Sequence, residues 1–286
     1  MLSPLIRFKI FSFGGMAMEK FRNKLGLLVV CLVLVLSTGA VKAALIGQWH
    51  MDDGSGSVIT DSSGNGSDLT KGAGYSWSTG YTGGGLTNST AGEYSSGSIA
   101  AALRPTTQLT MSAWIKPSGL NASEDTRIVG IENAATLSVT YWGTLRLQCR
   151  VTDLGNNGGW PLIDYENADD ILLDGNWHKV TGIFDGELNP GGAYHMYLYI
   201  DDVLVNGSWA AMSPDGNPVG FSSHSVPDTG AGTNVVIGGN PWNPSVNSYM
   251  GAIDEVAIYN SVFIPEPATM TLLAVGALAL IRRRIA

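Results

Sequence analysis

The fold is decided by a stretch of strict alternation, His195-Met196-Tyr197-Leu198-Tyr199-Ile200, followed by Asp201-Asp202 and Val203-Leu204-Val205-Asn206-Gly207. Two runs rich in β-branched and aromatic residues, joined by two residues that favour turns, predict a β-hairpin. Gly usually occupies the second position of such a turn, because φ is positive there. Asp202 adopts this conformation only at some cost in free energy.

Short apolar segments with strand character recur along the chain between clusters of turn residues. Gly accounts for 37 of 286 residues, about 13 % where about 7 % is usual, and it stands between these segments, where turns need positive φ. Regularly spaced short strands without intervening helices favour an all-β sandwich over an α/β fold. The predicted strands are 45–51, 109–116, 127–132, 136–141, 145–151, 177–185, 234–238 and 253–259.

Acidic residues dominate the region between the two ends. Residues 44–262 contain 7 Lys and Arg but 22 Asp and Glu, which gives a formal charge of −15. A domain of this charge repels phosphate backbones, which argues against nucleic-acid binding. Cys149 is the one cysteine in this region, so no intramolecular disulfide is expected there. The domain must be stabilised by burial of its apolar side chains.

The N-terminal residues have the layout of a secretory signal peptide. Lys20, Arg22 and Lys24 precede an apolar run at 25–36, and Val41-Lys42-Ala43 forms a small-residue cleavage site. The run is too short to span a bilayer comfortably, which argues against the alternative of a permanent anchor. We therefore expect a signal peptide at 1–43, removed by signal peptidase, and export of the chain.

The C-terminal residues combine three features in a fixed order. Pro265-Glu266-Pro267 precedes an uncharged stretch at 268–281, and Arg282-Arg283-Arg284 follows it. This order resembles the PEP-CTERM sorting signal, which implies recognition by an exosortase in the inner membrane, cleavage near the motif and delivery to the cell surface or extracellular matrix. We expect residues 263–286 to hold a short transmembrane helix that anchors the chain transiently, with the arginines on the cytoplasmic side.

Seven phrases in the middle region together resemble the LamG-like, concanavalin A-like jelly-roll family. The resemblance implies two curved antiparallel sheets whose first and last strands pair, with Trp49 and Val256 in neighbouring strands. The expected fold is therefore an all-β, two-sheet antiparallel jelly-roll sandwich at 44–262, between the signal helix and the C-terminal transmembrane helix. The phrases are GQWHMDDGSG at 47–56, DSSGNG at 61–66, LTMSAWIKP at 109–117, WHKVT at 177–181, YLYIDD at 197–202, VIGG at 236–239 and GAIDEVAIYN at 251–260.

Calcium is the ion that this resemblance suggests. Ca²⁺ binds six to eight oxygens from carboxylates, amides and backbone carbonyls. Asp52, Asp53, Asp61, Asn65 and Asp254 supply such oxygens, and the family's fold implies that they gather near the paired first and last strands. In the alternative, Asp61 and Asn65 only form Asx-turns, and Asp254 only binds a neighbouring backbone group. We expect a structural Ca²⁺ held by Asp52, Asp61, Asn65 and Asp254.

Eight tryptophans suggest a sugar-binding surface, because flat rings with an N–H donor suit the apolar faces of sugars. Trp49, Trp114 and Trp177 fall in strand motifs and are expected in the core. The other candidates lie beside Gly, Ser, Asn or Pro, as exposed loop residues do, although core packing is the alternative for each. These candidate ligand-binding residues are Trp77, Trp142, Trp160 and Trp242.

Catalytic motifs are absent from the sequence. Some concanavalin A-like relatives are glycoside hydrolases with a Glu-x-Asp-x-x-Glu strand, and no such string occurs here. Asp164, Glu166, Asp169 and Asp170 form the densest carboxylate cluster, but their polar segment is expected to be a solvated loop. The histidines have no metal-binding spacing, and no Gly-x-Ser-x-Gly motif occurs. We expect a non-catalytic surface or matrix protein that binds polysaccharide or protein; the alternatives are a purely structural matrix component and a glycoside hydrolase.

Overall fold

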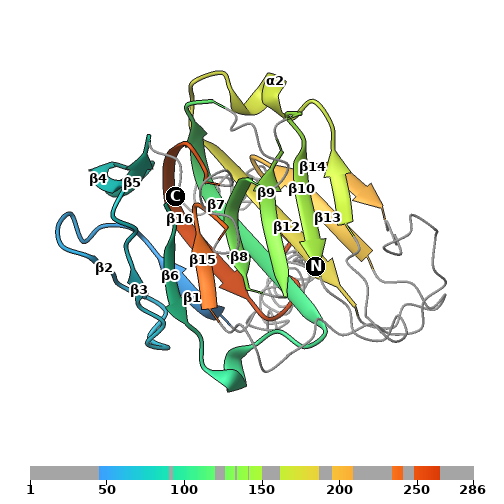
Figure 1. Ribbon diagram of the computed structural model, residues 1–286. Helices are drawn as coiled ribbons and strands as arrows, with labels where there is room; N and C mark the ends of the chain where they lie inside the picture. Colours follow the sequence, from blue (N-terminus) through green and yellow to red (C-terminus); the bar gives the residue numbers. More distant parts are fainter. Residues whose placement is uncertain are drawn as a thin grey trace, which may run out of the picture. The chain divides into compact units, whose positions relative to one another are not determined.

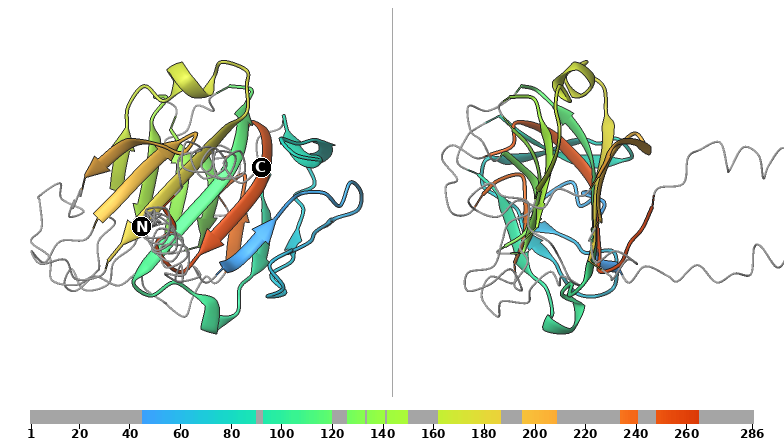
Figure 2. Two further views of the ribbon diagram at one scale, coloured as in Figure 1. Left: turned by 180° about the vertical axis from the view of Figure 1, so that it is seen from behind. Right: turned by 90° about the vertical axis from the view of Figure 1, so that its right-hand side faces the viewer.

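The computed structural model describes residues 45–89, 93–119, 126–132, 134–140, 142–149, 162–186, 195–208, 234–240 and 248–264. The expected signal peptide and the expected sorting helix lie outside these ranges. Within them, no helix is long and apolar enough to cross a membrane. The described residues form two antiparallel sheets that face each other, which confirms the all-β, two-sheet prediction (Figures 1 and 2).

The first sheet, called sheet A, contains the predicted hairpin at one edge. Its strands, in spatial order, are β14 (Val203–Ser208), β13 (His195–Ile200), β12 (His178–Asp185), β7 (Gln108–Pro117), β16 (Gly251–Tyr259), β5 (Gly84–Asn88) and β4 (Tyr75–Thr79). Strand β1 (Leu45–Trp49) also pairs with β16.

The second sheet, called sheet B, has shorter strands at one edge. Its order is β11 (Leu162–Tyr165), β10 (Leu145–Cys149), β9 (Ala135–Val139), β8 (Thr126–Ile131), β15 (Asn234–Ile237), β6 (Ser95–Ser98), β3 (Leu69–Thr70) and β2 (Val58–Ile59). Two short helical segments complete the described elements, η1 (Ala101–Leu103) and α2 (Asp169–Leu172).

The first and last strands of the sandwich pair as expected. Trp49 on β1 lies opposite Val256 on β16. The Trp49 side chain is fully buried, and its Nε1 donates a hydrogen bond of 2.9 Å to the carbonyl of Ser67. Because a buried indole N–H without a partner would be costly, this bond keeps the ring in the core.

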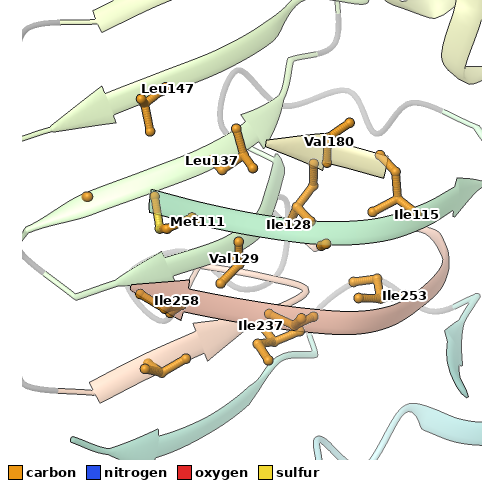
Figure 3. Close-up of a cluster of buried hydrophobic side chains, with 14 of the residues drawn as sticks. Met111, Ile115, Ile128, Val129, Leu137, Leu147, Val180, Ile237, Ile253 and Ile258 are labelled. Atoms are coloured by element: carbon orange, nitrogen blue, oxygen red, sulfur yellow. The ribbon is translucent and has the colours of Figure 1, made fainter. Parts of the chain in front are cut away.

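The core lies between the two sheets and follows from the alternation along each strand. On β7, Met111 and Ile115 point inward and are fully buried. On sheet B, Leu137 and Leu147 reach Gly182 of β12: a Cβ there would lie 3.1 and 3.0 Å from their nearest methyl carbons. Figure 3 shows side chains of both sheets meeting in this layer. Each buried Leu or Ile contributes roughly 1.5–3 kcal/mol relative to an exposed one.

Several strands were not predicted. Strands β4, β5 and β6 lie in Gly- and Ser-rich sequence, and β11 lies in a polar segment. Such residues have low β propensity, and these strands form because neighbouring strands offer backbone hydrogen bonds. The expected solvated loop at 164–170 comprises the end of β11, a turn at 166–168 and the start of α2. The prediction that Trp114 and Trp177 are core residues is also wrong, since both are half-buried outside the core cluster.

Candidate functional site

The turn between β4 and β5, Gly80-Tyr81-Thr82-Gly83, is held by two of the expected calcium ligands. Asp52 Oδ1 accepts a hydrogen bond of 2.6 Å from the backbone N–H of Gly84. Asp254 Oδ2 accepts one of 3.0 Å from the backbone N–H of Thr82. The two carboxylates come from the segment after β1 and from β16, so distant parts of the chain hold the turn at Thr82 and Gly84.

Close packing restricts positions 80 and 83 of the same turn to glycine. A Cβ at Gly80 would lie 1.8 Å from the carbonyl oxygen of Gly84 and 2.5 Å from Asp254 Oδ2. Gly83 has a φ of 66°, and a Cβ there would lie 2.4 Å from Asp52 Oδ1. Only glycine lets the backbone approach both carboxylates this closely.

Tyr81, at the tip of this turn, stacks flat on Trp114. The ring centroids are 3.4 Å apart and the planes differ by 8°. Trp114 lies on the outer face of sheet A, because its strand neighbours Ala113 and Ile115 are buried in the core. Tyr81 exposes 48 % of its surface. We call Tyr81 and Trp114 the aromatic platform.

Asp254 lies beside the platform, since it is the residue of β16 that pairs with Trp114. The residue is 0 % exposed, and its Oδ1 accepts a hydrogen bond of 2.7 Å from the backbone N–H of Glu255. Burial raises the pKa of Asp254 to about 6, although hydrogen bonds from Thr82 and Glu255 act in the opposite direction. Both carboxylate oxygens therefore bind backbone groups.

Two non-glycine residues near the platform have strained backbones. Met51 has a φ of 55° and Glu255, in the bulge of β16, has a φ of 50°. The Glu255 side chain contacts His50, the residue before Met51: His50 Nδ1 lies 2.7 Å from Glu255 Oε2. Positive φ at such residues costs about 1–3 kcal/mol and is concentrated at ligand-binding and switch regions. The strain adds to the reasons for treating this region as the candidate site.

Asp61 and Asn65 take structural roles at a different turn, beside β1. Asp61 accepts hydrogen bonds from the backbone N–H groups of Gln48, Ser63 and Ser67 and from the Ser63 hydroxyl. Burial acts to raise the pKa of Asp61, but these bonds outweigh it and lower the pKa. Asn65 Nδ2 donates to the carbonyl of Leu45 at 2.7 Å. Asp61 thus forms an Asx-turn with Ser63, as in the alternative, whereas Asn65 attaches its turn to β1.

The four expected calcium ligands therefore do not gather at one point. Asp52 and Asp254 flank the turn that carries Tyr81, whereas Asp61 and Asn65 bind the backbone near β1. Among the residues that the structure describes, no three His, Cys, Asp or Glu side chains are grouped closely enough to hold a metal ion. Calcium binding stays a prediction.

The tryptophans expected at a ligand site lie in different surroundings. Trp77 on β4 is half-buried, packs against the core, and donates from Nε1 to the carbonyl of Gly56 at 3.0 Å. Trp142 follows β9 and exposes 56 % of its surface. Trp160 and Trp242 fall outside the described residues. The prediction missed Tyr81, for which the available signal was an aromatic residue flanked by Gly80 and Gly83 in a short turn.

The densest carboxylate cluster is engaged in ordinary structural contacts. Arg146 Nε and a terminal guanidinium nitrogen each donate a hydrogen bond of 2.8 Å to Asp164. Asp169 and Asp170 form the first turn of α2, where negative charge is favourable. Glu166 is exposed in the turn between β11 and α2.

Similar solved structures include domains of bacterial toxins. The binding domain of Paraclostridial mosquitocidal protein 1 has a TM-score of 0.52 and 15 % identity, and the match covers 77 % of this chain and 49 % of that chain. The receptor-binding domain of botulinum neurotoxin mosaic serotype C/D has a TM-score of 0.54 and 14 % identity, and the match covers 81 % of this chain and 51 % of that chain. The botulinum neurotoxin serotype D binding domain has a TM-score of 0.50 and 17 % identity, and the match covers 80 % of this chain and 51 % of that chain. This chain thus spans about half the length of these structures, and the likeness concerns the fold alone.

Sequence comparisons agree with the fold. None of the curated proteins compared with this chain matches it. The PEP-CTERM protein-sorting motif matches residues 263–284, which confirms the resemblance seen at the C-terminal end. The family model of the concanavalin A-like lectin/glucanases superfamily matches residues 88–266, and the chain belongs to this superfamily.

Proposed function

We propose that this chain is an exported, non-catalytic carbohydrate-binding protein of the cell surface or extracellular matrix, and that the aromatic platform contacts the sugar. The observation that carries the proposal is the geometry of Tyr81, a half-exposed ring lying flat on Trp114. The apolar face of a pyranose stacks on such a ring. Because Asp52 and Asp254 already hold the turn in place, binding loses little conformational entropy.

The carboxylates near the platform support a binding role over hydrolysis. A glycosidase needs two carboxyl groups that reach the scissile bond, about 5–10 Å apart. Asp254 is fully buried with both oxygens on backbone N–H groups, and Asp52 accepts a hydrogen bond from the Gly84 N–H. Since the superfamily contains both lectins and glucanases, the fold by itself does not choose between these activities.

The sorting motif supports the proposed location. A PEP-CTERM signal implies processing by an exosortase, export, and a surface or extracellular destination. We propose that signal peptidase removes residues 1–43 and that the C-terminal segment anchors the chain in the inner membrane before processing. The proposed partners at the surface are polysaccharides, or a surface protein, and not nucleic acid.

A structural Ca²⁺ is a further proposal for this region. Carboxylate and backbone oxygens are its preferred ligands, and the carboxylates of Asp52 and Asp254 face the same turn. Asp61 and Asn65 are poorer candidates, because they lie at another turn, beside β1.

The Tyr81 proposal is tested by glycan-array screening of the purified chain, followed by calorimetric titration of the sugar that binds best. Tyr81→Ala should weaken binding by about 2- to 13-fold, because a ring contact of this kind is worth about 0.5–1.5 kcal/mol. Tyr81→Phe keeps the ring and should bind as the unmodified chain does. Equal affinities for all three proteins would contradict the role of the platform.

Other results of the same experiment favour the alternatives. Failure to bind any glycan, with normal folding, would favour a purely structural matrix component or a protein partner. Release of reducing sugars from β-glucans, abolished by Glu166→Gln, would establish a hydrolase and overturn the proposal.

A further inference from the structure

His178, the first residue of β12, lies between two carboxylates that come from separate loops. Its Nδ1 is 2.8 Å from Asp201 Oδ2, and its Nε2 is 3.0 Å from Asp174 Oδ1. The residue exposes only 7 % of its surface. Asp174 belongs to the segment between α2 and β12, and Asp201 begins the β13–β14 turn. His178 therefore connects both segments to β12.

We infer that His178 is an imidazolium ion that locks the β13–β14 turn and the α2–β12 segment onto the start of β12, and that this lock opens when the ring loses its proton. A carboxylate only accepts hydrogen bonds, so both ring nitrogens must donate. A neutral imidazole carries one N–H. Deprotonation therefore leaves a nitrogen lone pair facing a carboxylate oxygen at about 3 Å, which is a repulsive contact.

The charged groups around the ring favour the protonated form. Asp174 and Asp201 face it directly, and the neighbouring cation, Lys179, forms an ion pair with Asp202. On the other side of β12, strand β7 places the apolar Ile115 opposite His178. Burial acts to lower the pKa of His178, but the hydrogen bonds and negative charges of Asp174 and Asp201 outweigh it and raise the pKa above 6.5.

The lock stabilises a turn that is otherwise unfavourable. Asp201 and Asp202 both have positive φ, 51° and 62°. Asp201 offsets this cost through its side chain, since Oδ2 binds His178 and Oδ1 accepts a hydrogen bond of 3.0 Å from the Lys179 N–H. Glycine, the usual residue for such a conformation, has no carboxylate with which to make these bonds.

Nitrogen NMR of the histidine side chains in the purified full-length chain tests the protonation state directly. At pH 6.5, where an unperturbed histidine is half charged, His178 should show two protonated ring nitrogens. Its signals are assigned by their loss in His178→Gln, or, if that variant does not fold, by their shift in Asp174→Asn. A neutral ring at this pH, or a midpoint at or below 6.5, would overturn the inference.

Thermal unfolding between pH 5.5 and pH 9 tests the lock. Because the pKa of His178 is raised in the folded state, its stabilisation is complete below the unfolded value of about 6.5 and is lost as the pH rises through the folded value. The Tm should therefore fall with rising pH by about 2–4 °C more than in His178→Gln, whose side chain has no proton to lose in this pH range. His50→Gln is the matched control. His50 contacts one carboxylate, to which a ring with a single N–H can still donate, so this variant should keep the full pH dependence of the unmodified chain. Identical profiles for the unmodified chain and both His178→Gln and Asp174→Asn would contradict the lock.

Discussion

At the β13–β14 turn, two adjacent aspartates have the same backbone strain but different side-chain contacts. Asp201 binds His178 and the Lys179 backbone, whereas Asp202 forms one ion pair with Lys179 near the surface. Exposed ion pairs contribute only about 0–1 kcal/mol. The two positions therefore differ in how much stability their carboxylates supply.

The matched substitutions Asp202→Gly and Asp201→Gly separate backbone strain from side-chain bonding. Asp202→Gly should stabilise the fold slightly, by up to about 0.5 kcal/mol, because glycine adopts positive φ without the Cβ penalty. Asp201→Gly should destabilise it by roughly 1–3 kcal/mol, because the same relief is accompanied by loss of the bonds to His178 and Lys179. Urea unfolding of both variants measures the difference, and a loss of stability in Asp202→Gly would argue against the assigned turn.

At the scale of elements, the β4–β5 hairpin is the part of sheet A that presents the platform. Its strands have little apolar sequence of their own, and the pairing of Trp77 with Leu86 attaches β4 to β5. Strand β5 in turn pairs with β16, where Ile253 lies opposite Leu86. The position of Tyr81 thus depends on backbone pairing and on the two carboxylates that hold the turn.

Gly80→Ala tests this dependence. The added Cβ would lie within 2 Å of the Gly84 carbonyl oxygen, so the turn must shift. We expect a loss of roughly 1–3 kcal/mol in unfolding free energy, together with weaker stacking of Tyr81 on Trp114, seen as a change in tryptophan fluorescence. Gly119→Ala is the control, because nothing lies within 4 Å of a Cβ there. If both variants behave alike, close packing does not determine the turn.

At the scale of the whole molecule, the two sheets bury one apolar layer between them. In sheet A the last strand, β16, pairs with the first strand, β1. Asp52, which follows β1, thereby comes within hydrogen-bond reach of the β4–β5 turn. Calcium bound by the carboxylates that hold this turn would therefore raise the stability of the whole sandwich.

Calcium binding predicts a concentration-dependent Tm. A ligand at 100 times its Kd stabilises the folded state by about 2.7 kcal/mol, which corresponds to a rise of about 5–10 °C for a domain of this size. The measurement compares the purified chain in chelator with the same sample after addition of excess Ca²⁺, and Mg²⁺ serves as the control for ionic strength. A Tm that is the same in all three conditions removes the proposal.

Local patterns were sufficient to predict much of the fold. Alternation at 195–207 predicted the hairpin and its two-residue turn. The pairing of Trp49 with Val256 was instead predicted from the resemblance to the jelly-roll family. Apolar strands such as β7 and β12 were found within one or two residues of their ends. The hairpin and the apolar strands could be predicted because side-chain alternation and turn chemistry are properties of adjacent residues.

The candidate site was decided by tertiary structure. Tyr81 meets Trp114, 33 positions later in the sequence, on a turn whose Thr82 is bound by Asp254, 172 positions further along the chain. His178 likewise acquires its second carboxylate from the far end of a hairpin. Short-range patterns carry no information about such contacts, since burial, stacking and charge pairing arise when distant strands become neighbours. The local sequence therefore determined the apolar strands, while the folded sheets determined the Gly- and Ser-rich strands and which side chains meet.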